Sequence, residues 1–194
     1  MTRRTLARIA LAGLGASAVI IAAIWFVVLP ALLPDGQKPF DFYMGSMTFD
    51  QVRDLMLALG ERGRTLYRYA LVPLDMVLVV AYGAGIGCAI VWLRGIPETR
   101  KQHPDPYEMR RRQPAGRRIR SAVGSVFLVA PFLAAAFDFW ENVLIFRLLG
   151  QGEGVSLRLM EELNRTTAYK WAFLGLSGVA LFFALLGFLA RRGR

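Results

Sequence analysis

The chain has 194 residues, of which 55% are hydrophobic, and it carries a formal net charge of +10. Its apolar residues form four long blocks instead of alternating with polar ones, which argues against a soluble domain and against a closed β-barrel. The single cysteine, Cys88, excludes an internal disulfide and a cysteine-based metal site. We therefore predict an all-α protein with one integral membrane domain, residues 1–194, built as a four-helix transmembrane bundle.

The basic residues are distributed unevenly among the segments that connect these blocks. The two terminal tails and residues 94–120 carry fifteen Lys/Arg and three acidic residues, whereas residues 35–68 and 147–170 carry nine Lys/Arg and eight acidic residues. Because segments rich in Lys and Arg stay in the cytoplasm, we expect a multi-pass protein of the plasma (inner) membrane with both termini cytoplasmic. The excess charge then indicates orientation and contact with anionic lipid headgroups, not binding of nucleic acid.

A bilayer is crossed by about 20 residues of apolar helix. The four blocks predict transmembrane helices over about 8–29, 66–93, 120–149 and 169–190. Pro30 and Pro34 are expected to end the first of these helices, because proline cannot donate to the helical ladder.

The segment after the first helix contains a sequence typical of a helix start. Thr48 and Gln51 fit a capping box, in which the threonine hydroxyl caps a free N–H and the glutamine reaches back. Apolar residues then recur at helical spacing as far as Gly60, a natural helix stop. We expect a short amphipathic helix over about 48–60 on the outer membrane surface, acting as a plain cover of the bundle, a lid or a docking surface.

The remaining segments carry simpler signals. Gly83 and Gly87 form a GxxxG pair, which allows close helix packing within the bundle or in a homo-oligomer. Residues 95–119 are rich in proline and arginine, and they predict a basic cytoplasmic linker that is irregular or lies on lipid headgroups. Pro131 predicts a kink in the third helix, and residues 157–164 predict a short helical turn before the fourth.

Three acidic residues lie inside the predicted transmembrane helices, where each charge costs about 2.5–3.5 kcal/mol on insertion scales. Asp75 belongs to the second helix, whereas Asp138 and Glu141 belong to the third. Counted along the helical rise, all three lie at a similar depth in the outer half of the membrane. Asn142 shares a helix face with Asp138 and Glu141, because their spacing is i, i+3, i+4.

Other polar residues are placed to interact with these acids. Tyr82 lies seven residues after Asp75 and Arg68 seven residues before it, so all three are expected on one face of the second helix. Lys170, at the outer end of the fourth helix, and Arg68 are the candidate positive partners. The sequence thus nominates an intramembrane polar cluster as the place where a site would lie.

Three functions are compatible with this pattern. The first is a non-enzymatic accessory or assembly subunit of a membrane complex, with another membrane protein or a second copy as partner. The second is a carboxylate site, formed by Asp75, Asp138 and Glu141, for proton or cation transfer or for a lipid-like ligand. The third is an enzyme acting on a lipid substrate. The sequence identifies no cofactor, no catalytic motif and no metal-binding motif.

Overall fold

The structure, a computed structural model, describes residues 1–33, 38–43, 45–95, 115–152 and 154–192. Throughout these residues the regular structure is helical, which confirms the all-α prediction. The elements are α1 (Arg3–Ala23), η1 (Ile24–Val28), α2 (Leu29–Leu32), η2 (Phe40–Tyr43), α3 (Phe49–Leu66), η3 (Tyr67–Leu71), α4 (Val72–Arg94), α6 (Ala115–Gly150) and α7 (Leu157–Arg192).

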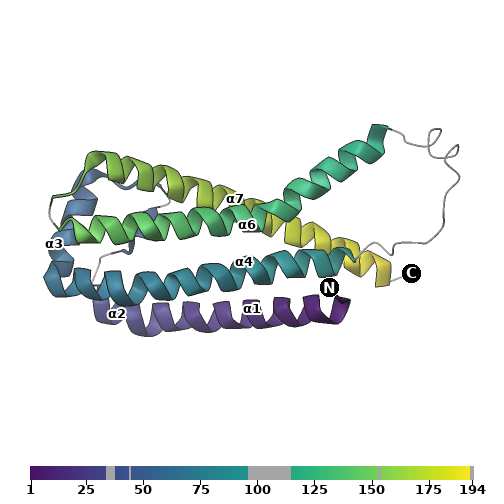
Figure 1. Ribbon diagram of the computed structural model, residues 1–194, viewed down its shortest axis with the longest axis horizontal. Helices are drawn as coiled ribbons and strands as arrows, with labels where there is room; N and C mark the ends of the chain where they lie inside the picture. Colours follow the sequence, from purple (N-terminus) through teal and green to yellow (C-terminus); the bar gives the residue numbers. More distant parts are fainter. Residues whose placement is uncertain (34–37, 44, 96–114, 153, 193–194) are drawn as a thin grey trace, which may run out of the picture.

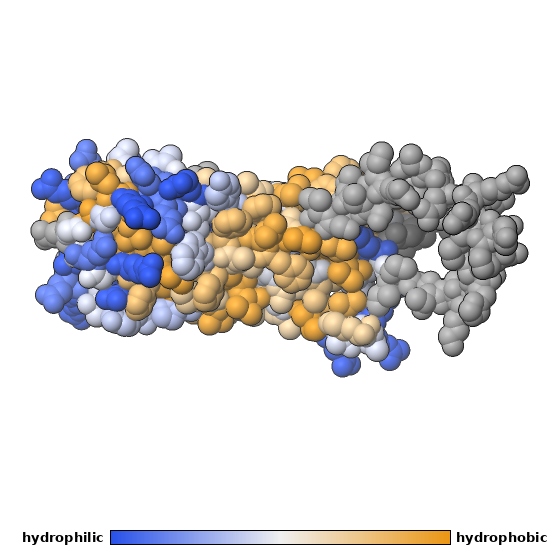
Figure 2. Space-filling view, turned by 45° about the horizontal axis from the view of Figure 1, so that its top comes forward, coloured by the Kyte–Doolittle hydropathy of each residue, from blue (hydrophilic) through white to orange (hydrophobic). Residues whose placement is uncertain are grey.

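Four helical stretches in the described part of the chain are long and apolar enough to cross a membrane. They are Arg3–Leu32, Phe49–Arg94, Phe127–Gly150 and Leu157–Ala190. The four long helices run side by side, α3 lies at one end of the bundle, and both chain termini lie at the other end (Figure 1). On the face seen in Figure 2, apolar residues form a broad band in the middle of the molecule and polar residues gather at the α3 end. This arrangement suits a multi-pass membrane protein.

Small residues bring the helices of the bundle close together. α4 lies at the centre, because it contacts α1 on one side and both α6 and α7 on the other. A Cβ atom added to Gly83 would lie 2.9 Å from Cβ of Ala135, and one added to Gly87 would lie 2.9 Å from Cζ of Phe132. Real Cβ atoms do not approach neighbours so closely. The GxxxG pair is therefore used for packing against α6 within this chain.

Two wide, π-helical turns interrupt the helices, and each lies just before a proline. η1 precedes Pro30, and η3 precedes Pro73. In each case the N–H of the residue after the turn donates to the carbonyl five residues earlier. Proline has no N–H, and its ring crowds the preceding turn, so the backbone widens there. The first helix consequently continues through Pro30 as far as Leu32, beyond the predicted end near residue 29.

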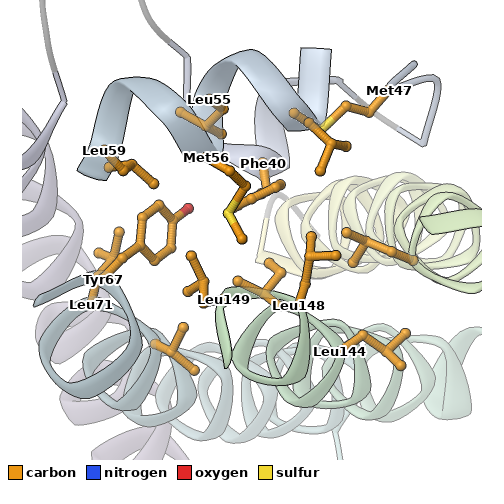
Figure 3. Close-up of a cluster of buried hydrophobic side chains, with 14 of the residues drawn as sticks. Phe40, Met47, Leu55, Met56, Leu59, Tyr67, Leu71, Leu144, Leu148 and Leu149 are labelled. Carbon is orange, nitrogen blue, oxygen red and sulfur yellow. The ribbon is translucent and has the colours of Figure 1, made fainter. Parts of the chain in front are cut away.

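α3 covers the end of the bundle with its apolar face. The predicted capping box is present, because Thr48 N–H donates to Oε1 of Gln51 (2.8 Å) and Gln51 N–H donates to Oγ1 of Thr48 (3.3 Å). The apolar side chains that follow are buried against the ends of α4 and α6 (Figure 3). This face is thus occupied by the protein's own core and is not available to lipid. The buried residues of α3 are Val52, Leu55, Met56 and Leu59.

α3 changes direction at Gly60 instead of ending there. This glycine has φ 59° and ψ −175°, a left-handed value of φ that favours glycine. Helical structure then resumes and leads through η3 into α4, so the predicted cover helix and the second span are joined without a loop. Arg64 Nη1 donates to the carbonyl of Met56 at 2.9 Å, so this bond connects the helical segments on the two sides of Gly60.

The second half of the chain departs from the predicted boundaries in two places. α7 is one unbroken helix from Leu157, so the predicted turn over 157–164 and the predicted fourth helix form a single element. Thr166 does not interrupt it, because its hydroxyl donates to the carbonyl of Glu162 one turn earlier. α6 contains Pro131, as predicted, and it bends along its length (Figure 1). It begins at Ala115, and the part of the predicted linker over 96–114 lies outside the described residues.

Candidate functional site

The acids of α6 are paired with the lysine of α7. Lys170 Nζ lies 2.6 Å from Oε2 of Glu141 and 2.9 Å from Oδ1 of Asp138. Thr167 Oγ1 donates a hydrogen bond to the other carboxylate oxygen, Oε1, of Glu141. Glu141 is fully buried, and Asp138 and Lys170 are each 5% exposed. The two acids and the lysine therefore form a buried cluster of three charges, which we call the ion triad below, and Thr167 adds one hydroxyl bond to it.

The acid of α4 joins this triad through neutral groups. Asn142 Nδ2 donates to Oδ2 of Asp75 at 2.7 Å and to the backbone carbonyl of Asp138 at 3.1 Å. Tyr82 donates its hydroxyl proton to Oδ2 of Asp138 at 2.8 Å. Asp138 thus accepts bonds from both α4 and α7, and Asn142 connects the carboxylate of Asp75 to the backbone carbonyl of Asp138. One polar network consequently ties α4, α6 and α7 together inside the bundle.

Arg68 is the one predicted site residue that lies elsewhere. Its guanidinium carbon is 4.1 Å from the ring centroid of Phe146, and its nitrogens pack against Gly150 at the end of α6. The expectation that it shares a face with Asp75 assumed a regular α-helix between them. The π-helical turn η3 holds an additional residue per turn and rotates Arg68 away from that face. Pro73 was the sequence signal for this irregularity.

The network forms one wall of a cavity of about 600 Å³ inside the bundle. Five polar residues of the network reach the cavity surface: Asp75, Tyr82, Asp138, Asn142 and Lys170. Glu141, which is fully buried, does not. The rest of the lining is mostly apolar and comes largely from α1 and its π-helical turn, from η3 and α4, and from the part of α7 just after Lys170. Representative residues are Ile21, Ile24, Trp25, Tyr67, Trp171 and Leu174.

The sequence did not predict that the two π-helical turns contribute side chains to the site. Trp25 and Ile24 belong to η1, and Tyr67 and Leu71 belong to η3, and all four line the cavity. Each wide turn displaces the helix axis next to a proline. The two prolines were visible in the sequence, but nothing in the chain predicted that the turns would face the same cavity.

The polar groups of the site can bind a ligand through hydrogen bonds and ionic interactions. Within the described residues, no group of three or more His, Cys, Asp or Glu side chains is arranged to hold a metal ion. The cavity wall offers carboxylate acceptors, an amide, a phenol and an ammonium group that is already engaged by two carboxylates. Such a surface suits an amphiphile with an apolar body and one polar end.

Comparisons with known protein families, with curated proteins and with solved structures found no match for this chain. The functional conclusion therefore depends on the site itself.

Proposed function

We propose that this protein binds a lipid-like amphiphile inside the membrane. The apolar body of the ligand would occupy the cavity beside α1 and α7, and its polar end would bond the network at Asp75, Tyr82 and Asn142. The observation that carries this proposal is the position of the polar network, which forms one wall of an otherwise apolar cavity of about 600 Å³. Ligand sites are commonly apolar hollows of this size with a few placed polar groups.

The network has two parts, the buried ion triad and Asp75 at the cavity wall, and this arrangement supports ligand binding over a purely structural role. The ion triad links α6 to α7 without Asp75, and Glu141 within it does not reach the cavity. Packing of α6 against α7 does not require a third carboxylate on α4, where an intramembrane acid is costly. Asp75 nevertheless lies at the cavity wall, held by the Asn142 amide. A polar ligand gives this carboxylate a role beyond its bond to Asn142, because Asp75 also lines the cavity.

A direct test is to identify what copurifies with the protein. The protein would be extracted in native-membrane nanodiscs, and bound small molecules would be released and identified by mass spectrometry. We expect one class of amphiphile to be enriched over the bulk lipid, and we expect Asp75→Asn to lose it. Asp54→Asn, an exposed acid on α3, is the matched control and should retain it. Bulk lipid alone in the parent protein would rule out a tightly held ligand.

An accessory or assembly subunit of a membrane complex is our second proposal. Its support is the outer side of α3, which exposes Asp50, Arg53 and Asp54 while its apolar side is buried in the bundle. A partner would therefore bind this charged side or the basic segment 95–119. Purification from native membranes without a stoichiometric partner, and without a second copy, would count against this role. Catalysis on a lipid ranks third, because the buried carboxylate Glu141 is engaged by Lys170 and Thr167.

We also propose that the protein resides in the plasma (inner) membrane with both termini in the cytoplasm. The support is the uneven distribution of Lys and Arg between the two sets of connecting segments.

A further inference from the structure

We infer that the polar end of the bound amphiphile is cationic, so that the site selects a long-chain amine over a neutral or anionic analogue. This inference rests on the proposed function, because it names the chemical class of the same ligand. In this inference Asp75 recognises the positive charge of the ligand. The ion triad does not contact that charge, and it holds the cavity wall in place.

The first argument is the charge of the network. Among the described residues that form it, three carboxylates, Asp75, Asp138 and Glu141, accompany one ammonium group, Lys170. With all of them ionised, the network has an excess of two negative charges in a poorly solvated environment. Excess charge of one sign is costly there. A positive group in the cavity reduces the excess, a neutral group leaves it unchanged, and an anion increases it.

The second argument is which carboxylate the cavity presents. Lys170 lies between Asp138 and Glu141, within 2.9 Å of an oxygen of each. Asp138 also accepts the Tyr82 hydroxyl. The hydrogen bond that Asp75 accepts from Asn142 comes from an uncharged amide, and Asp75 is only partly buried at the cavity surface. A cation in the cavity can therefore reach Asp75 without displacing Lys170 from Asp138 and Glu141.

The third argument concerns the remaining walls of the cavity. Trp25, Tyr67 and Trp171 contribute aromatic rings to its lining, and ring faces attract cations, indole most strongly. The ammonium of Lys170 already lies 5.9 Å from the ring centroid of Trp171. An anionic head would find one ammonium, already held by two carboxylates, and would add a further negative charge beside them. The cavity thus favours positive charge both at its polar wall and at its aromatic walls.

Three probes with the same alkyl chain and different heads test the inference. They are a terminally brominated long-chain alkylamine, the corresponding alcohol and the corresponding carboxylate. Bromine quenches tryptophan fluorescence on contact, and Trp25 and Trp171 line the cavity. Quenching would be titrated in the purified full-length protein, in Asp75→Asn, in Asp75→Glu and in the control Asp54→Asn. Circular dichroism and gel filtration would establish that each variant is folded.

We expect the parent protein and Asp54→Asn to bind the amine at least about tenfold more tightly than the alcohol, a difference of about 1.4 kcal/mol. Asp75→Glu keeps the charge and should keep the preference. Asp75→Asn should bind amine and alcohol equally. Equal binding of both probes by the parent protein would mean that a proton neutralises the site, and it would overturn the inference while leaving the proposed function intact.

Two other outcomes of the probe titration would also count against the inference. Tightest binding of the carboxylate probe would show that Lys170 recognises an anion, and it would overturn the inference. If no probe quenches more strongly in the parent protein than in folded Asp75→Asn, and no amphiphile copurifies, the inference and the proposed function both fail.

Discussion

Removal of the Lys170 charge should destabilise the protein strongly. Lys170→Met keeps most of the side-chain volume but leaves Asp138 and Glu141 without their ammonium partner, and Glu141 is fully buried. Loss of one partner from a buried ion pair costs about 3–5 kcal/mol, because the other charge remains desolvated. Folded proteins are commonly stable by only about 5–15 kcal/mol. We therefore expect Lys170→Met to lose about a fifth or more of the free energy of unfolding.

A second substitution determines whether that loss has an electrostatic cause. Adding Glu141→Gln to Lys170→Met removes the most deeply buried carboxylate and should recover part of the stability. Asp138→Asn added to Lys170→Met should recover less, because Asp138 reaches the cavity and also accepts the Tyr82 hydroxyl. Glu141→Gln in the parent background should itself be destabilising. Non-additivity of this sign is expected of residues that share one network.

The measurement is reversible unfolding of the purified protein in mixed micelles, with stepwise addition of a denaturing detergent and circular dichroism as the readout. Arg158→Met, which removes an exposed cation from the same helix, is the matched control and should change stability by less than about 0.5 kcal/mol. The reasoning is refuted if Lys170→Met unfolds like the control. It is also refuted if Glu141→Gln deepens the loss in the Lys170→Met background.

Three other predictions test separate parts of the structure. A topology reporter fused at Gln102 should read cytoplasmic and one at Gly152 external, and the reverse pattern would overturn the proposed orientation. Gly83→Ala should lower unfolding stability by about 1–3 kcal/mol through overpacking against α6, whereas Gly178→Ala, where an added Cβ meets nothing within 4 Å, should not. Asn164→Ala removes both hydrogen bonds that tie α7 to the backbone before α3, so limited proteolysis should cut that segment faster, and an unchanged rate would contradict this role.

The features that the sequence predicted best depend on local rules. The capping box at Thr48 and Gln51 formed because it requires only four adjacent residues. The shared face of Asp138 and Asn142 followed from regular helical spacing within α6, where no irregular turn separates them. The four spans followed from length and composition alone. None of these predictions required knowledge of which helices are neighbours.

The features that escaped prediction depend on departures from the regular helix and on tertiary packing. Arg68 was expected beside Asp75, but the π-helical turn η3 breaks the seven-residue spacing. The place of α1 in the bundle could not be derived either, because an apolar helix carries no signal of which helix it packs against. Trp25 therefore gave no indication that it would line a cavity. The acids were identified, whereas the apolar walls opposite them were not.

The network combines two tasks that mutagenesis must keep apart. Glu141, Lys170 and Thr167 are buried and hold α6 against α7, so changes in them are expected to act first through folding. Asp75 and Tyr82 lie on α4 at the cavity wall and are only partly buried, so changes there can alter binding in a protein that still folds. A loss of function caused by Lys170→Met would therefore say little about a ligand. The same loss caused by Asp75→Asn, in protein that unfolds like the parent, would locate the ligand at this wall.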